Sequence, residues 1–252
     1  PAKIYCSILK NLKFSNEKLE QIKKRLVKWD GSMNIESIEP TIYSAMRISL
    51  NKKLAEYNLG HLSKDALDSA GQGIPGHMRQ LEALFVTHAQ QNKTELLPLD
   101  MNWNSLIKDS FIDGIQWLTN WIGDDKNLWK WGDVHKTFPT HPLSSIFPNL
   151  SDLLNPPSIS INGDGDTPNA GFFGPSKPFN IMATSVARYY FDLSDWNQCK
   201  WIVPLGSSGH PGSKHYFDQM KKWSQTNLIP MLYDWKMIQA NSISSQILKP
   251  IN

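Results

Sequence analysis

The sequence predicts an α+β protein with a helical N-terminal half and a β-rich C-terminal half. Through residue 125, apolar residues recur every three or four positions, which is the spacing of helices that bury one face. After Lys126 prolines cluster, and short stretches alternate between apolar and polar residues as strands do. We therefore expect a mainly helical segment over residues 1–125 and a β-rich segment over residues 126–252, as two layers of one structural unit.

The helices of the first half are predicted from their apolar faces and their boundary residues. A helix through Ile4 begins almost at the first residue, without a clear cap. The next is expected to start after Ser15, whose hydroxyl can accept a hydrogen bond from the first turn, and to stop at Gly31. Pro40 suits the first turn of a third helix, because the N–H that proline lacks would be unused there. Two more helices are expected over residues 78–89 and 103–122, after a break at residues 73–76.

The second half is expected to contain a β-hairpin. Residues 185–193 alternate between two faces, one more polar than the other, and residues 200–205 form the returning strand. Residues 195–198 carry the polar side chains that favour a turn between them. A short helix over residues 215–224 and a final helix over residues 235–240, reached through residues 229–233, complete the prediction.

Composition and charge exclude several classes of protein. The formal net charge of +3 is small for 252 residues and the basic residues are scattered, so we expect no nucleic-acid partner. No run of about eighteen apolar residues is present, and no membrane association is expected. Cys6 and Cys199 lie far apart in the sequence, and they predict neither a metal pair nor a disulfide framework.

Residues 163–169, with the sequence GDGDTPN, form the first of two unusual loops. Asp164 and Asp166 supply oxygens of the kind that Ca²⁺ prefers, but no glutamate closes the loop where an EF-hand requires it. The alternative is a tight turn in which Asp and Asn side chains bond to their own backbone. We expect the turn, with calcium binding as the second interpretation.

The second unusual loop, residues 206–219, is rich in glycine, serine and histidine, a mixture that neither helix nor strand interiors tolerate. A serine nucleophile is one interpretation, with His210 and Asp195 nearby. However, the sequence GSSG at residues 206–209 is one residue short of the nucleophile elbow G-x-S-x-G. A triad is also defined by geometry, not by nearness in sequence. We therefore expect this loop to supply shape.

Two histidine pairs suggest zinc as a further interpretation. His135 with His141, and His210 with His215, are spaced so that the rings do not share one helical face, and no cysteine assists them. The alternative is that these histidines bond loop carbonyls, which we expect, and we expect no metal in this chain.

These segments resemble, in order and spacing, the C-terminal end of the penicillin acylase family, most of all its cephalosporin acylase and acyl-homoserine-lactone acylase branches. The resemblance rests on both loops, on residues 131–135 followed by 141–143, on residues 187–196 and on residues 229–233. The helical half is similar more loosely, at residues 29–31. The family-like residues of the second loop are Gly206, Ser208, Gly209, His210, Pro211, His215, Tyr216, Asp218 and Gln219. Lys214 departs from the pattern, because proline is usual there, and this departure is expected to loosen the loop without altering the fold.

The resemblance implies an N-terminal-nucleophile hydrolase with a four-layer αββα sandwich, of which this chain is the C-terminal part of the β subunit. In that family a precursor cleaves itself, and a serine freed at the start of the β chain attacks an amide carbonyl. Its own α-amino group is the base, and backbone and asparagine donors hold the oxyanion. Pro1 has no hydroxyl or thiol, so the resemblance implies a nucleophile and a calcium-binding segment outside this chain. Asp164 or Asp166 is the candidate for the carboxylate that some members place behind an active-site histidine, and no cofactor is expected here.

Three functions are compatible with these features. The first is a fragment of an acylase that cleaves small acyl amides and is inactive without the α subunit and the start of the β subunit. The second is a binding or structural module that keeps the scaffold without catalysis. The third, a free-standing hydrolase using His210 and His215, predicts activity of this chain alone. Because the family sheets take strands from both ends of the β chain, strands such as residues 186–193 are expected to leave unpaired edges and to favour self-association.

Overall fold

A computed structural model describes residues 1–68, 82–174 and 177–250, and these form two compact units. The first unit comprises Pro1–Pro139 and Pro157–Thr184, and the second comprises Thr140–Pro156 together with the described residues from Ser185 onward. The expectation that the helical and β-rich segments are layers of one unit stays a prediction. In the described part of the chain, no helix is long and apolar enough to cross a membrane.

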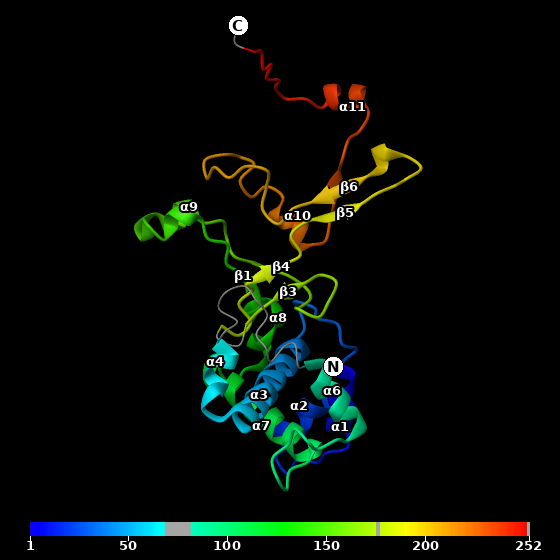
Figure 1. The fold of residues 1–252 in the computed structure, drawn as a ribbon, viewed down its shortest axis with the longest axis vertical. Helices are drawn as coiled ribbons and strands as arrows, with labels where there is room; N and C mark the ends of the chain where they lie inside the picture. Colours follow the sequence, from blue (N-terminus) through cyan, green and yellow to red (C-terminus); the bar gives the residue numbers. More distant parts are fainter. Residues whose placement is uncertain (69–81, 175–176, 251–252) are drawn as a thin grey trace. The chain divides into compact units, whose positions relative to one another are not determined.

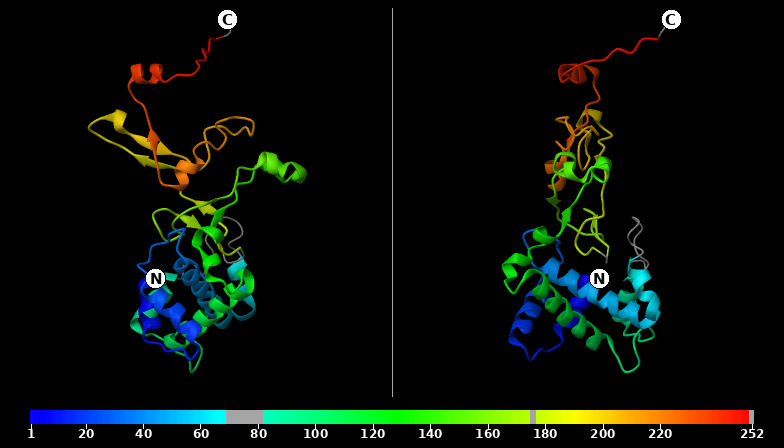
Figure 2. Two further views of the ribbon diagram at one scale, coloured as in Figure 1. Left: turned by 180° about the vertical axis from the view of Figure 1, so that it is seen from behind. Right: turned by 90° about the vertical axis from the view of Figure 1, so that its left-hand side faces the viewer.

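The first unit is built around a pair of long helices that lie side by side (Figures 1 and 2). These are α3 (Glu39–Leu59) and α7 (Trp103–Ile122). Gly114 of α7 allows their close contact, because a Cβ at this position would lie 2.8 Å from the Met46 backbone nitrogen. The other helices of this unit are α1 (Ala2–Lys10), α2 (Glu17–Val27), α4 (Ser63–Asp68), α6 (Glu82–Gln91) and α8 (Trp131–Val134), with 3-10 turns η1 (Gly60–Leu62) and η3 (Lys126–Trp129). Their apolar faces form one buried core.

The predicted helices of the first unit are confirmed in the described residues, with both ends of α2 corrected. Asn16, not Ser15, caps α2, since the Asn16 side chain accepts the Leu19 N–H at 3.2 Å. The helix also ends at Val27, before Gly31. The N–H groups of Lys28 and Trp29 donate to carbonyls three residues earlier, as in a 3-10 turn, and this ends the α-helical pattern. The expected break at residues 73–76 and the start of the helix at 78–89 lie outside the described residues.

Short strands complete the first unit. β1 (Lys136–Thr137) pairs antiparallel with β2 (Ile159–Ser160), and β3 (Gly171–Phe172) pairs antiparallel with β4 (Ala183–Thr184). A parallel bridge joins Thr137 to Ile181, whose N–H donates to the Lys136 carbonyl at 2.9 Å. These pairings bring β2 and Ile181 against the segment that follows α8.

The second unit contains the predicted hairpin. β5 (Arg188–Tyr190), β6 (Lys200–Ile202) and β7 (Ile229–Pro230) form an antiparallel sheet in the order β5-β6-β7. The strands are shorter than the predicted 185–193 and 200–205. Beyond β5 the Asp192 carboxylate accepts the N–H groups of Ser194 and Asp195, which bends the chain away from the ladder. The 3-10 turn η6 (Trp196–Gln198) then occupies the predicted turn.

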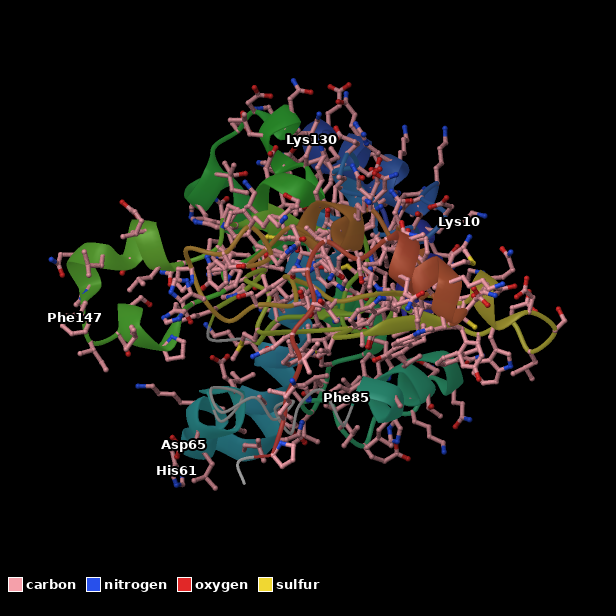
Figure 3. All side chains as sticks on the ribbon, turned by 90° about the horizontal axis from the view of Figure 1, so that it is seen from above. Lys10, His61, Asp65, Phe85, Lys130 and Phe147 are labelled. Carbon is pink, nitrogen blue, oxygen red and sulfur yellow. The ribbon has the colours of Figure 1, made fainter. Side chains whose placement is uncertain are left out.

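The remaining helices of the second unit are short. They are α10 (Met220–Ser224) and α11 (Trp235–Ala240), together with η4 (Pro142–Ser144), η5 (Pro148–Leu150) and α9 (Ser151–Leu154). α11 is confirmed with its predicted bounds. The helix expected from residue 215 begins only at Met220, because the residues before it close a loop described below. Phe147, half exposed, lies between η4 and η5 in the segment that carries α9 (Figure 3).

Candidate functional site

The loop over residues 163–169 in the first unit is a self-bonded turn. Gly163 has a φ of +91°, in the left-handed region that favours glycine. The Asp164 carboxylate accepts the Asp166 N–H at 2.8 Å. The Thr167 hydroxyl accepts the Asp164 N–H at 2.9 Å and donates to the Asp164 carbonyl at 3.1 Å. This is the tight turn that the sequence predicted.

An arginine from α3 faces the two carboxylates of this loop. Arg47 Nη1 lies 2.5 Å from Asp166 Oδ2 and 3.9 Å from Asp164 Oδ2. Arg47 is 8% exposed and Asp164 only 2%, whereas the Asp166 side chain is 36% exposed. Charged groups are rarely buried to this extent unless they are paired. These three residues, the Arg47 cluster, therefore tie the loop to α3, with Asp166 as the member that solvent reaches.

Sequence reasoning identified both carboxylates of the Arg47 cluster but missed the arginine. One signal was available, because Arg47 follows a run of apolar and small residues, 41–46, within a helix. All of these residues are buried. An arginine at the end of such a run requires a carboxylate from elsewhere in the chain.

His135 lies in a second buried cluster of the first unit. It is 0% exposed, its ring stacks on Trp131 with centroids 4.2 Å apart, and its Nδ1 lies 2.9 Å from the Phe179 carbonyl oxygen. Nδ1 therefore carries the proton and donates it to that carbonyl, as expected of a structural histidine. Nε2 has no hydrogen-bond partner among the described residues, and a Cβ on Gly171 would lie 2.9 Å from it. Burial lowers the pKa of His135 to about 4, outweighing the bond to Phe179, which raises it.

Trp131 links His135 to the GDGDTPN loop. Its indole Nε1 donates to the Gly163 carbonyl at 2.9 Å. The carbonyl of Phe179 accepts the hydrogen bond from His135. Phe179 is fully buried and has a φ of +69°, a conformation that bulky residues rarely adopt. The neutral imidazole thus holds a strained backbone segment beside the loop that carries the candidate carboxylates.

We expect the first unit to lose stability on acidification between pH 6.5 and about 4. The unfolded His135 has the ordinary pKa of 6.5 and the folded one a pKa of about 4, so the unfolded state binds the proton more tightly and acid favours unfolding. Protonation of His135 thus lowers the free energy of unfolding by about 3 kcal/mol in total. This loss is absent above about pH 7 and complete below about pH 4. Urea unfolding followed by far-ultraviolet circular dichroism measures it, because the long helices belong to the first unit.

The variant His135→Gln isolates this contribution from that of the carboxylates. Its free energy of unfolding should be lower at neutral pH but should change less between pH 6.5 and 4 than that of the parent. His61→Gln, in the exposed η1, is the control for loss of one histidine. Equal pH dependence of parent and His135→Gln proteins would show that His135 does not titrate in this way.

The loop over residues 206–219 in the second unit closes at its base. The Gln219 N–H donates to the Leu205 carbonyl at 2.9 Å, and the Ser208 N–H donates to the His215 carbonyl at 3.1 Å. A Cβ on Gly206 would lie 2.1 Å from that His215 oxygen. The two ends of the loop therefore meet at a backbone approach that only glycine permits.

One histidine–carboxylate pair stands at this base. His215 Nδ1 and Asp218 Oδ2 are 2.7 Å apart, and both side chains are about two-fifths exposed, at 43% and 39%. An aspartate that orients an imidazole is a part of many catalytic triads. However, the hydroxyls of Ser208 and Ser213 accept the N–H groups of His210 and His215 and so support local turns. The arrangement favours a shaping role for this loop.

The residues of the alternative triad have other partners. Asp195 accepts the Asn197 N–H at 2.9 Å in the hairpin turn, and His210 Nδ1 accepts the Gly212 N–H at 3.0 Å. His141 Nδ1 similarly accepts the Leu143 N–H at 3.2 Å. In the described ranges, no three His, Cys, Asp or Glu side chains gather as metal ligands would. Among the candidate residues predicted from the sequence, those with buried charge thus belong to the Arg47 cluster.

Comparison with solved structures identifies the fold. The chain matches a thermostable penicillin G acylase from Alcaligenes faecalis over 100% of its own length and 46% of the other chain, with a TM-score of 0.53 and 13% sequence identity. At this identity the match shows the fold alone, and the fold is similar to that of the matched penicillin G acylase chain. The predicted α+β class is confirmed.

Sequence comparison then gives the family. Residues 3–240 match the penicillin amidase family, and the chain belongs to that family. It is 32% identical over 232 residues to the penicillin acylase 2 proenzyme of Pseudomonas sp. (strain SE83), covering 92% of this chain but 29% of the relative. It is 26% identical over 102 residues to an acyl-homoserine lactone acylase of Pseudomonas putida, covering 40% of this chain and 12% of the relative. The chain thus spans less than a third of each curated relative.

Proposed function

We propose that this chain is the C-terminal part of the β subunit of an amide-hydrolysing acylase whose nucleophilic serine lies upstream of it. One observation carries the proposal: the family match runs through residues 3–240, yet the chain spans 29% of the length of a relative that is named a proenzyme. The names of the relatives, a penicillin acylase and an acyl-homoserine lactone acylase, support an acyl amide as the substrate class.

The chemistry proposed for the whole protein is acyl transfer to a serine and then to water. The hydroxyl of the N-terminal serine attacks the amide carbonyl while its α-amino group accepts the proton, and that proton then goes to the departing amine. Water, activated by the same amino group, releases the acid from the acyl-enzyme. In this account residues 1–252 supply the scaffold, and the upstream part of the precursor supplies the nucleophile and the oxyanion donors.

Asp166 is the better placed of the two carboxylates for a role behind a histidine of the upstream segment. Asp164 is buried and bonded to the turn, whereas the Asp166 side chain is 36% exposed and is held at 2.5 Å by Arg47. We propose that Arg47 positions Asp166 and that Asp164 maintains the turn. Asp166→Asn should then lower kcat in the protein that remains folded and also lower stability, because the buried Arg47 loses its nearest carboxylate, whereas Asp164→Asn should lower stability alone.

The test compares this chain alone with the same chain produced together with the upstream region of its gene. The joined protein is expected to cleave at least one amide in a panel of phenylacetyl and long-chain acyl substrates, and the chain alone to give only the rate of the blank. Replacing the freed N-terminal serine by alanine should abolish the activity. A folded, joined protein that cleaves no member of the panel would instead support the non-catalytic scaffold module.

A further inference from the structure

Asn162 stands at the start of the GDGDTPN loop and forms with Gly163 the only Asn-Gly pair in the sequence. The side-chain amide of an asparagine is open to attack by the backbone nitrogen of the residue that follows it, and asparagine is therefore among the thermolabile residues. Glycine in the following position favours this attack, because it has no Cβ to obstruct the approach and the least restricted backbone. Asn162 is thus the asparagine at which the sequence most favours deamidation.

The reaction requires water as its only co-reactant. The Gly163 nitrogen bonds to Cγ of Asn162 and closes a succinimide ring, the Cγ–Nδ2 bond breaks, and the proton of the Gly163 N–H leaves with the ammonia. Water then opens the ring. Opening at Cγ gives aspartate, whereas opening at the main-chain carbonyl carbon gives isoaspartate, whose backbone is longer by one carbon atom.

In the folded chain the groups that this reaction needs are held by other residues. The Gly163 N–H, which contains the attacking nitrogen, donates to the Met33 carbonyl at 2.8 Å. Asn162 Oδ1 accepts the Ile35 N–H at 2.9 Å, which fixes the side chain that would be attacked. The Asn162 carbonyl accepts a hydrogen bond from Asn169 Nδ2 at 2.7 Å. These three hydrogen bonds, the Asn162 clamp, hold the peptide group between Asn162 and Gly163 on both sides.

The surroundings of Gly163 make this restraint rigid. A Cβ on Gly163 would lie 2.1 Å from the Asn169 carbonyl oxygen, so the backbone has no room to rotate toward the Asn162 side chain. The Trp131 indole holds the next peptide group through the Gly163 carbonyl at 2.9 Å. Asn162 itself is exposed, so its protection depends on the Asn162 clamp and not on exclusion of water.

We propose that Asn162 is the deamidation site of this chain and that the Asn162 clamp gates the reaction. Deamidation then proceeds only from states in which residues 33–35 have released the loop. The isoaspartate product makes the opening permanent, because its longer backbone does not fit beside a Gly163 with a φ of +91° and no free space. The aspartate product keeps the normal backbone and an oxygen for the Ile35 N–H, so it lets the turn close again.

Peptide mass spectrometry of the joined protein, with chromatography that separates asparagine, aspartate and isoaspartate peptides, tests the proposal. Samples are incubated in mildly alkaline buffer, either native or in urea above the unfolding transition. In urea, Asn162 should be the most rapidly modified asparagine of residues 1–252, and in the native protein it should react about tenfold more slowly or less. Equal rates in the two samples would overturn the gate, and faster modification of another asparagine in urea would overturn the assignment of the site.

A variant that removes one hydrogen bond of the Asn162 clamp tests the gate locally. Asn169→Ala should raise both native deamidation at Asn162 and hydrogen exchange of the Gly163 amide about fivefold, the effect of one hydrogen bond on an opening equilibrium. Asn58→Ala is the matched control, because the Asn58 amide also donates to backbone carbonyls, at 2.8 and 3.0 Å, but elsewhere in the first unit. It should change neither rate. A native rate at Asn162 that Asn169→Ala leaves unchanged, or that it raises equally in urea, would contradict the gate.

Limited proteolysis of the aged native protein measures the consequence of the modification. Molecules with isoaspartate at position 162 should be digested first, whereas molecules with aspartate there should remain in the resistant fraction with unmodified protein. Isoaspartate in equal proportion in both fractions would show that the turn accepts the longer backbone, and the proposed permanent opening would be wrong.

Discussion

Replacing Gly163 by alanine is expected to lower the free energy of unfolding of the first unit by about 3 kcal/mol or more. Two costs combine at this position. The φ of +91° is unfavourable for any residue with a Cβ, at about 1–2 kcal/mol. The new Cβ would also lie 2.1 Å from the Asn169 carbonyl oxygen, so the GDGDTPN turn must open, and overpacking of this kind costs about 1–3 kcal/mol. Urea unfolding followed by circular dichroism measures the loss.

Gly31 provides a matched control for this substitution. Its φ is +89°, nearly that of Gly163, but a Cβ there would meet nothing within 4 Å. Gly31→Ala should therefore show the conformational cost alone, about 1 kcal/mol. Equal losses for the two variants would mean that the Gly163 turn is not closely packed and that the Arg47 cluster is not held as described.

Replacing Gly206 by alanine is expected to open the loop over residues 206–219, at a cost of about 3 kcal/mol to the second unit. Its Cβ would lie 2.1 Å from the His215 carbonyl oxygen and 2.7 Å from Asp218 Oδ1. The His215 carbonyl oxygen belongs to the backbone, so it can move away from the new Cβ only if the whole turn moves. The hydrogen bonds from the Ser208 N–H to the His215 carbonyl and from the Gln219 N–H to the Leu205 carbonyl should therefore be lost together. Faster hydrogen exchange at these two amides and faster proteolysis within the loop are the measurements.

The control for Gly206 lies in the same loop. A Cβ on Gly209 would meet nothing within 4 Å, so Gly209→Ala should change exchange and proteolysis little. If Gly206→Ala behaves like Gly209→Ala, the base of the loop is not closed by close backbone contact, and the shaping role assigned to it is wrong.

Features set by neighbouring residues were predictable from the sequence. The bounds of α7 follow from its apolar stripe and from Asn102, whose side chain accepts the Ser105 N–H at 2.9 Å. At the start of α2 the error, Ser15 for Asn16, was a choice between adjacent residues that are equally good caps. The self-bonded turn at Asp164 is equally local, and it was predicted.

Features set by distant partners were not predictable in the same way. Arg47 and Asp166 are separated by 119 positions, and no periodicity in either segment specifies the other. The two- and three-residue strands depend on the partner with which each pairs, so their ends could not be placed from alternation alone. The His215–Asp218 pair is local, at a separation of three residues, but the hypothesis drawn from the sequence was His210 with Asp195, and this pair was not anticipated.

Family membership came from the order of several loops rather than from any reactive residue. The residues that carried it, in the loops at 163–169 and 206–219, are those whose backbone geometry requires glycine or a side-chain-bonded turn. Such positions tolerate few substitutions, which is why they remain recognisable when a nucleophile is not in view.

Covalent labelling of the joined, processed protein locates its nucleophile. A sulfonyl fluoride such as phenylmethanesulfonyl fluoride reacts with an activated serine, and peptide mass spectrometry then locates the label. We expect loss of amide hydrolysis together with a label on the N-terminal serine of the processed chain, outside residues 1–252. A label on Ser207, Ser208 or Ser213 that accompanies the loss of activity would contradict it, because the nucleophile would then lie within this chain.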